Sequence, residues 1–500
     1  MRPVPAPRIV AALVACGLGL AACTGGSGDP SASGSASPSA VPTGDPSSTA
    51  TDVDFTPCGA QFACSGKLGE TPYDIRLPET WNGTLLIYSH GLRPVDPVDP
   101  ADDAFTPTAE AAPGLAGGVA RVADALLEKG YALAGAGAPT GGWTVTGAVD
   151  AVDALHAAFA THVGVPDRVL TWGASLGGLT AARAGQEYPW VNGTASLCGI
   201  LAGLNPNLDL ALDTAVAVKA LLEPDLKLTG YRSVKDARRN YRAATKAVEE
   251  AAVEPTGAGR TALQVIAAIG NLPTQSANSS GGTSAELAQA LVENLEPVLA
   301  RTTLERFRIE EQYGGNPSTN AGVNYGARLT VEQANAIDAA APQGEGTTLR
   351  LVRAVAAVPE VAADEDARTA ADEAFPRPSA LAKPIITLHT SADPAAILAN
   401  ETLFGGWAAQ ASGADIRWLN VNVSNPPKAY PKQGPAPYGA GHCNFTAQSV
   451  IGAVEVLDDW VRLGRFPTWA GNVRAFGANS GFAGPVSLPA WPLSPTTQDQ

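Results

Sequence analysis

A Gly-x-Ser-x-Gly pattern spans Gly173 to Gly177, with Ser175 at its centre. It follows a short apolar run, residues 168–172, that is typical of a strand, and it opens a helical run at 179–187. In this strand-turn-helix context the turn is tight: side chains at Gly173 and Gly177 would collide with neighbouring backbone, and the serine is held out at the edge of the sheet. The start of the helix favours developing negative charge. We therefore expect Ser175 to be a nucleophile on this turn, the nucleophile elbow.

A serine hydroxyl attacks only when a base removes its proton, so the hypothesis requires a histidine downstream. The sequence has five histidines. His442 is the best base, because it lies in the glycine-rich segment 438–444, after the last predicted strand and before the last predicted helix. The other histidines are expected on a crossover helix (His156 and His162) or in loops that they shape (His90 and His389).

The base needs an acid that holds its ring in one tautomer. Asp393 follows a predicted strand at 384–388 and gives the chain order serine, acid, histidine. The alternative role for Asp393 is that of a turn or helix-cap aspartate in front of Pro394.

Acyl transfer also needs two backbone N–H groups aimed at the oxyanion of the tetrahedral intermediate. We expect one from Leu176, the residue after the nucleophile. The other should come from the loop after an early strand. The run 85–92 ends in a His-Gly step of the kind that shapes this loop, so the second donor is assigned to Leu92.

A mostly parallel sheet is the element that could position these residues. Residues 73–200 alternate short apolar strands with helical stripes, which is the pattern of a parallel sheet covered by helices. Strand patterns return late in the chain, and a final amphipathic helix is expected at 450–463. The fold class is therefore α/β. The predicted strands are 84–88, 131–136, 168–172, 194–197, 384–388 and 416–423.

The alternation stops in the middle of the chain, where Ala, Leu, Glu and Arg dominate. Thr283 with Glu286 and Thr330 with Gln333 are helix-start signals in this region. It is expected to be a helical insertion. The predicted division is a core at 58–200 and 380–470, the insertion at 201–379, and a wrapping or loose tail at 471–500.

The N-terminus resembles an export signal. A short basic region precedes an apolar stretch, residues 9–22, that is too short for a membrane helix. The stretch ends in Leu-Ala-Ala-Cys, which resembles the lipobox of bacterial lipoproteins and implies that residues 1–22 are removed and Cys23 carries lipid. Plain secretion is the alternative. Residues 23–57 are rich in Ser, Thr, Gly and Pro and predict a flexible tether. The chain is expected on the extracellular face of a bacterial membrane, or secreted.

Cysteine usage fits export, because an exported chain can keep disulfides. Of six cysteines, one leaves with the leader and Cys23 would carry lipid. Four remain: Cys58, Cys64, Cys198 and Cys443. The short spacing of the first two favours 58–64 with 198–443 among the three connectivities, which the sequence leaves open.

Charge and motifs exclude several classes of protein. The formal net charge of -15 argues against a nucleic-acid partner, because phosphate binding needs a basic face. The sequence has no His-Glu-x-x-His and no Cys-x-x-Cys, and too few histidines for a metal site. Gly135 and Gly137 lack the spacing of a dinucleotide loop. We expect neither a metal nor a cofactor.

The elbow and the order of Ser175, Asp393 and His442 resemble the α/β-hydrolase superfamily over roughly 73–200 and 380–465. The resemblance implies an α/β-hydrolase fold with a mostly parallel central sheet and the three residues on its loops. It also implies that the insertion, which begins after the strand that follows the elbow, is a helical cap that shapes the substrate pocket.

A cysteine beside the histidine is reminiscent of secreted tannase and feruloyl-esterase-like enzymes. Those enzymes also place a cysteine beside the serine, where this chain has Ala174. A bridge between Cys198 and Cys443 would hold the loop of the histidine to the sheet.

The expected activity is hydrolysis of carboxylic esters through an acyl-enzyme, with a small-molecule or acyl-ester substrate. One alternative is a serine exopeptidase of aminopeptidase type, which would need an acidic pocket for a substrate amine. Another is a lipid-anchored binding protein that kept the fold without the activity. The fold class does not decide the substrate.

Overall fold

The computed structural model describes residues 58, 62–96, 108–114, 119–375, 381–412, 415–424, 439–477, 482–483 and 486–492. All of them belong to one compact unit, Thr51–Gln500. The predicted leader, the predicted lipidation site Cys23 and the predicted tether lie outside the described residues.

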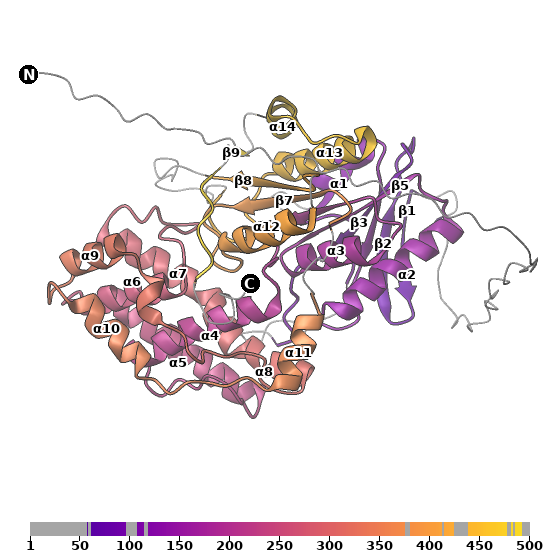
Figure 1. Cartoon of the computed structure of the whole chain (residues 1–500). Helices are drawn as coiled ribbons and strands as arrows, with labels where there is room; N and C mark the ends of the chain where they lie inside the picture. Colours follow the sequence, from indigo (N-terminus) through magenta and orange to yellow (C-terminus); the bar gives the residue numbers. More distant parts are fainter. Residues whose placement is uncertain are drawn as a thin grey trace, which may run out of the picture. The chain divides into compact units, whose positions relative to one another are not determined.

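A nine-stranded sheet forms the centre of this unit (Figure 1). The strands are β1 (Ala63–Leu68), β2 (Thr71–Arg76), β3 (Thr84–Ser89), β4 (Ala132–Ala136), β5 (Arg168–Ala174), β6 (Gly193–Leu197), β7 (Ile385–Thr390), β8 (Trp418–Val423) and β9 (Phe482–Ala483). Their order is β1-β2-β4-β3-β5-β6-β7-β8-β9. From β4 to β8 every neighbouring pair is parallel, and β1, β2 and β9 add antiparallel edges.

All six strands predicted from the sequence are confirmed as β3 to β8, with ends that shift by at most two residues. The sequence patterns missed the β1–β2 hairpin and β9. The side chains of β1 alternate between exposed and half-buried, and β9 has only two residues. Edge strands of this kind carry too little apolar periodicity to be recognised.

Helices cover both faces of the sheet. They are α1 (Val119–Glu128), α2 (Thr146–His162), α3 (Leu176–Glu187), α12 (Ala399–Ser412), α13 (Ala447–Leu463) and α14 (Trp469–Phe476). Successive side chains of a strand point to opposite faces. Leu85 and Ile87 of β3 accordingly join the core beneath α2, α3 and α12, whereas Leu86 and Tyr88 join the core beneath α1 and α13. Each buried aliphatic side chain of this kind contributes about 1.5–3 kcal/mol.

The insertion between β6 and β7 is helical in all its described elements. Its helices share a hydrophobic core that Ile397, Ala399 and Trp491 complete from outside the insertion. Its helices are α4 (Leu204–Leu221), α5 (Val234–Val253), α6 (Ala258–Ile269), α7 (Ser284–Thr302), α8 (Leu304–Tyr313), α9 (Val331–Ala340), α10 (Thr347–Ala356) and α11 (Glu365–Glu373), with a 3-10 turn at Tyr325–Arg328. Both predicted helix starts are confirmed as capping boxes, Thr283 with Glu286 and Thr330 with Gln333.

The C-terminal region differs from its prediction. The expected tail from residue 471 begins inside α14, and β9 pairs with β8 further on. An eight-residue helix offers too few turns to show an apolar period. Among the helices of the described residues, none is both long and apolar enough to cross a membrane.

Candidate active site

The elbow lies between β5 and α3, as the sequence predicts. Ser175 adopts φ 58° and ψ −122°, a region that costs a non-glycine residue about 1–3 kcal/mol. A Cβ at Gly173 would lie 2.2 Å from the carbonyl oxygen of Gly177, and one at Gly177 would lie 2.0 Å from that of Ser89. Only glycine fits these two positions, so the strained serine is fixed by its neighbours.

Ser175, His442 and Asp393 form one chain of hydrogen bonds, called the triad below. Ser175 Oγ lies 2.8 Å from Nε2 of His442. Nδ1 of the same ring lies 2.8 Å from Oδ2 and 3.0 Å from Oδ1 of Asp393. An ionised carboxylate only accepts, so Nδ1 carries the proton and Nε2 is left to accept from the serine hydroxyl. The fold thus brings His442 into contact with Ser175, 267 residues away in the sequence, and with Asp393, 49 residues away.

Asp393 is fully buried in a loop that is joined to the loop of the base. Its Oδ1 accepts hydrogen bonds from the backbone N–H groups of Ala395 at 2.9 Å and Ala396 at 2.8 Å. The N–H of Gly441 donates to the carbonyl of Ala392 at 2.9 Å, which connects the two loops next to His442. The cap-like turn considered as an alternative for Asp393 is therefore present, and the same carboxylate also holds the imidazole.

Electrostatics keep the Asp393 carboxyl ionised. Burial by itself raises its pKa, but the interactions with His442 and His389 and the hydrogen bond from the N–H of Ala396 together outweigh burial. The net result is a pKa below the usual value for aspartate. The acid can therefore orient a neutral imidazole and stabilise the imidazolium that forms during proton transfer.

His389 lies behind Asp393 and is fully buried. Its Nδ1 is 2.9 Å from Oε1 of Glu401 and its Nε2 is 2.6 Å from the carbonyl oxygen of Ala396. Because both ring nitrogens face acceptors, both donate, and the ring is an imidazolium. Burial lowers its pKa, but Glu401 and then Asp393 raise it above the usual value for histidine. The expected loop-shaping role holds, while Glu401, on α12, carried no sequence signal.

The favoured disulfide connectivity is confirmed. Cys58 is bonded to Cys64 and Cys198 to Cys443, with Cα–Cα distances of 5.2 and 5.4 Å. Cys198 and Cys443 have φ of 45° and 51°, in the left-handed region that residues other than glycine rarely adopt. The second bridge joins the end of β6 to the residue after His442, and Sγ of Cys443 is 3.4 Å from Nε2 of that ring. Both sulfurs are bonded to each other, so neither is a free thiolate for a metal.

The loop after β3 runs against the nucleophile. A Cβ at Gly91 would lie 3.3 Å from Cβ of Ser175. His90 fixes this loop, because its Nδ1 lies 2.7 Å from the carbonyl of Gly91 while its Nε2 accepts from the N–H of Ala138 at 3.2 Å. Burial lowers the pKa of His90, which favours the neutral ring that this pattern requires.

Leu92 and Leu176 border the nucleophile, where two oxyanion donors were predicted. Leu92 lines the same pocket as His442, and Leu176 opens α3, where the first N–H groups of a helix have no partner within it. Within the described residues, neither backbone N–H donates to a protein acceptor. Their role as oxyanion donors stays a prediction.

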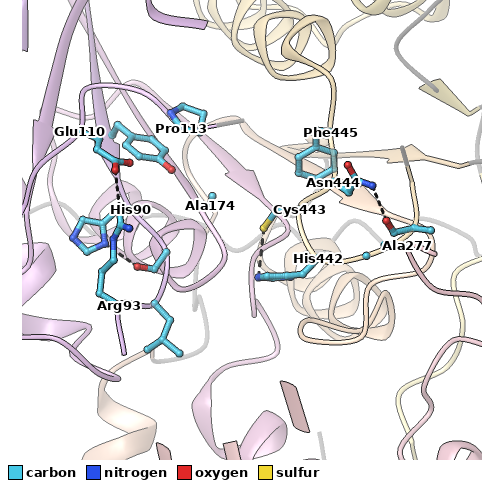
Figure 2. Close-up of a pocket in the computed structure, with 16 residues that line it drawn as sticks. His90, Arg93, Glu110, Pro113, Ala174, Ala277, His442, Cys443, Asn444 and Phe445 are labelled. Carbon is cyan, nitrogen blue, oxygen red and sulfur yellow. Dashed lines mark hydrogen bonds and ion pairs between the residues drawn. The ribbon is translucent and has the colours of Figure 1, made fainter. Parts of the chain in front are cut away.

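A pocket of about 570 Å³ opens beside the base (Figure 2). Arg93 and Glu110, paired at 2.8 Å, lie in one part of it, and His442 with Asn444 lies in another. Ala277, from the insertion between α6 and α7, also lines it. The sequence did not predict Arg93, Glu110 or Ala277 as pocket residues, because no local pattern brings them together.

Helices of the insertion contact the loops that carry the site. Arg301 of α7 donates to the carbonyl of Ala395 at 2.9 Å, two residues after the acid, and its guanidinium lies 5.0 Å from the ring centre of Trp143. The indole N–H of Trp143 donates to Glu305 of α8 at 3.0 Å. The insertion therefore packs against the carboxyl-terminal edge of the sheet, where the triad lies.

Comparison with known proteins finds structural neighbours only. No family model matches the sequence, and no curated protein matches it. An esterase from Aspergillus oryzae is 11% identical, with 81% of this chain and 80% of that chain covered and a TM-score of 0.37. Feruloyl esterase B from Aspergillus oryzae is 11% identical over 79% and 78% of the two chains, with a TM-score of 0.38. Est1E from Butyrivibrio proteoclasticus is 11% identical over 81% and 98%, with a TM-score of 0.30.

The chain itself carries the features that define its fold class. A mostly parallel sheet in the order β1-β2-β4-β3-β5-β6-β7-β8 has the elbow directly after β5, the acid after β7 and the histidine after β8. This arrangement is the α/β-hydrolase fold.

Proposed function

We propose that the protein is a serine hydrolase that cleaves carboxylic esters through an acyl-enzyme. The observation that carries the proposal is the hydrogen-bond chain from Asp393 through His442 to the strained Ser175. A serine held in this geometry beside a neutral imidazole is an activated nucleophile.

The reaction follows from the positions of these groups. Ser175 Oγ attacks the ester carbonyl while its proton passes to Nε2 of His442. The N–H groups of Leu92 and Leu176 receive the oxyanion, each contributing about 3 kcal/mol of transition-state stabilisation. His442 then returns the proton to the departing alkoxide, so an alcohol leaves and the acyl group stays on Ser175. Water, deprotonated by His442, attacks this ester and releases the carboxylic acid.

The test is labelling of the unit Thr51–Gln500 with a fluorophosphonate probe. We expect the modification on Ser175, and we expect Ser175→Ala and His442→Ala to abolish it. Ser65→Ala is the matched control, since Ser65 is an exposed serine on β1. A folded wild type that takes no label would favour the catalytically inactive binding protein.

The exopeptidase alternative requires a carboxylate that is free to bind a substrate amine. Glu110 lines the pocket, but Arg93 already neutralises it at 2.8 Å. A comparison of aryl esters with aminoacyl anilides separates the two functions: we expect turnover of the esters.

We also propose that the protein works outside the cell, anchored by lipid on Cys23. Two disulfides formed by the four remaining cysteines support an oxidising compartment. The mass of the N-terminal peptide from a membrane fraction tests the anchor. Loss of membrane attachment in Cys23→Ala is the expected result, and an unmodified N-terminus would favour plain secretion.

A further inference from the structure

Exposed apolar side chains concentrate at the junction of α13 and α14. Ten large hydrophobic residues of the described chain are exposed, and four of them lie within residues 463–473. They are Leu463, Phe466, Trp469 and Val473, with exposed fractions of 44%, 39%, 53% and 44%. With the arginines Arg462, Arg465 and Arg474, they are called the α13–α14 patch below. Monomeric proteins rarely gather exposed apolar groups without a binding partner.

The aromatic rings of the patch are held in place. Phe466 packs edge-on against Trp460 with ring centres 5.0 Å apart, and Trp469 packs against Phe482 at 5.0 Å. Trp469 and Val473 are one helical turn apart and share a face of α14. The rings are therefore fixed while much of their surface stays in water, so binding here would cost little side-chain entropy.

Positive charge coincides with these apolar groups. The chain has a formal net charge of -15, yet residues 460–498 contain three arginines and no aspartate or glutamate. Arg462 pairs with Asp459 at 2.6 Å. Across the part of the chain that the structure describes, Arg465 and Arg474 make no ion pair. The patch thus keeps two uncompensated positive charges on an otherwise acidic protein.

We propose that the α13–α14 patch docks on an anionic lipid surface. Tryptophan and phenylalanine favour the boundary between lipid headgroups and acyl chains, and exposed arginines bind lipid phosphates. The net charge of -15 repels an anionic bilayer on average, and the arginines of the patch offset this repulsion locally. A small patch gives weak, reversible binding on its own. It therefore acts as an orienting contact beside a stronger anchor, the role proposed for lipid on Cys23.

The patch follows the C-terminal end of α13 and the length of α14. A Cβ at Gly193, the first residue of β6, would lie 2.8 Å from Val461 near the end of α13. Arg168, the first residue of β5, pairs with Asp458 of the same helix end at 3.2 Å. This end of the patch therefore lies at the amino-terminal edge of the sheet. Trp469, in contrast, packs against Phe482, which pairs with Val423 at the carboxyl-terminal end of β8. The patch thus extends along the side of the molecule from one edge of the sheet toward the other.

The experiment is co-sedimentation of the unit Thr51–Gln500, which lacks the predicted anchor, with phosphatidylglycerol or phosphatidylcholine vesicles. We expect binding to phosphatidylglycerol alone, weakened by salt. Both Arg465→Glu/Arg474→Glu and Phe466→Ser/Trp469→Ser should lower the bound-to-free ratio at least about tenfold. The matched controls are Arg232→Glu/Arg353→Glu and Val165→Ser/Ile416→Ser, which change exposed residues elsewhere and should bind as wild type does. Ser175→Ala should also bind, which separates docking from catalysis.

No binding by the wild type, or binding that the patch variants leave unchanged, would overturn the docking. Patch-dependent dimerisation in light scattering without vesicle binding would assign the surface to a second copy.

Discussion

The buried imidazole of His389 lies 3.8 Å from the carboxylate of Asp393, so the acid of the triad stands between two histidines. The His442 side chain is 31% exposed and is the proposed base, whereas His389 is fully buried and hydrogen-bonded at both ring nitrogens. A fixed cation on the inner side helps to keep Asp393 ionised, while its pair with Glu401 neutralises the buried charge.

His389→Gln should lower the free energy of unfolding by about 3 kcal/mol or more, because it leaves Glu401 and Asp393 buried without their cation. The pKa of His389 is raised above 6.5 in the folded state. Its contribution is therefore complete below about pH 6.5 and disappears as the pH rises through the folded pKa. Urea unfolding from acidic to alkaline pH should show a difference in unfolding free energy between wild type and variant that becomes smaller as the pH rises.

His156→Gln is the control for that series. Burial lowers the pKa of His156, so its contribution is present at higher pH and disappears as the pH falls. The difference in unfolding free energy between wild type and variant should therefore shrink with rising pH for His389→Gln and grow with rising pH for His156→Gln. A difference for His389→Gln that stays constant from acidic to alkaline pH would show that this ring is neutral in the folded state.

Removal of the Cys198–Cys443 bridge should affect both stability and activity. The bridge spans 245 residues and ends beside His442. A Cys198→Ala/Cys443→Ala variant should lose about 2–5 kcal/mol of unfolding free energy. Its kcat should also fall, since the imidazole loses its attachment to the sheet. Cys58→Ala/Cys64→Ala, whose bridge spans six residues, is the matched control and should keep wild-type kcat. Equal kcat for both variants would contradict a positioning role for the longer bridge.

Gly177→Ala should abolish the native fold of the elbow. The new Cβ would lie 2.0 Å from the carbonyl oxygen of Ser89, and backbone on both sides prevents relief. We expect a loss of at least about 4 kcal/mol in chemical unfolding, or no soluble protein. Gly406→Ala places the same methyl in α12 with no atom within 4 Å and should be neutral or stabilising by about 0.5–1 kcal/mol. A stable, active Gly177→Ala would refute the steric account.

Arg301→Met tests whether the insertion positions the acid. The variant keeps the length of the side chain but removes the N–H that donates to Ala395, so the loop of Asp393 gains freedom. We expect kcat to fall roughly tenfold to a hundredfold with little change in KM, because the acid shifts relative to the base. Arg301→Lys, which keeps a donor, should recover part of the loss. Arg239→Met, on the exposed face of α5, is the control. An unchanged kcat in Arg301→Met would leave the insertion without a role in the triad.

The core of the site could be predicted because its signals are local. A strand-turn-helix with two obligatory glycines identifies Ser175, and the chemistry of a serine nucleophile then limits the search to few histidines and few acids. Asp393 and His442 each follow a predicted strand, so their place at one edge of a parallel sheet followed from the pattern. The disulfide pairing was favoured by a local signal too, because Cys58 and Cys64 are only six residues apart in the sequence.

The tertiary structure decided what no local pattern contains. Glu401, Arg301 and Glu110 are separated from their partners by loops or by the whole insertion, and their sequence neighbours carry no period that indicates a site. Charged side chains on helices are usually solvated. Only the packing of α7 and α12 against the loops of the sheet therefore distinguishes Arg301 and Glu401 from the other charged residues of these helices. The sequence by itself thus determined which groups could do the chemistry. The fold alone determined which groups hold them, because burial and electrostatic environment arise only when distant segments meet.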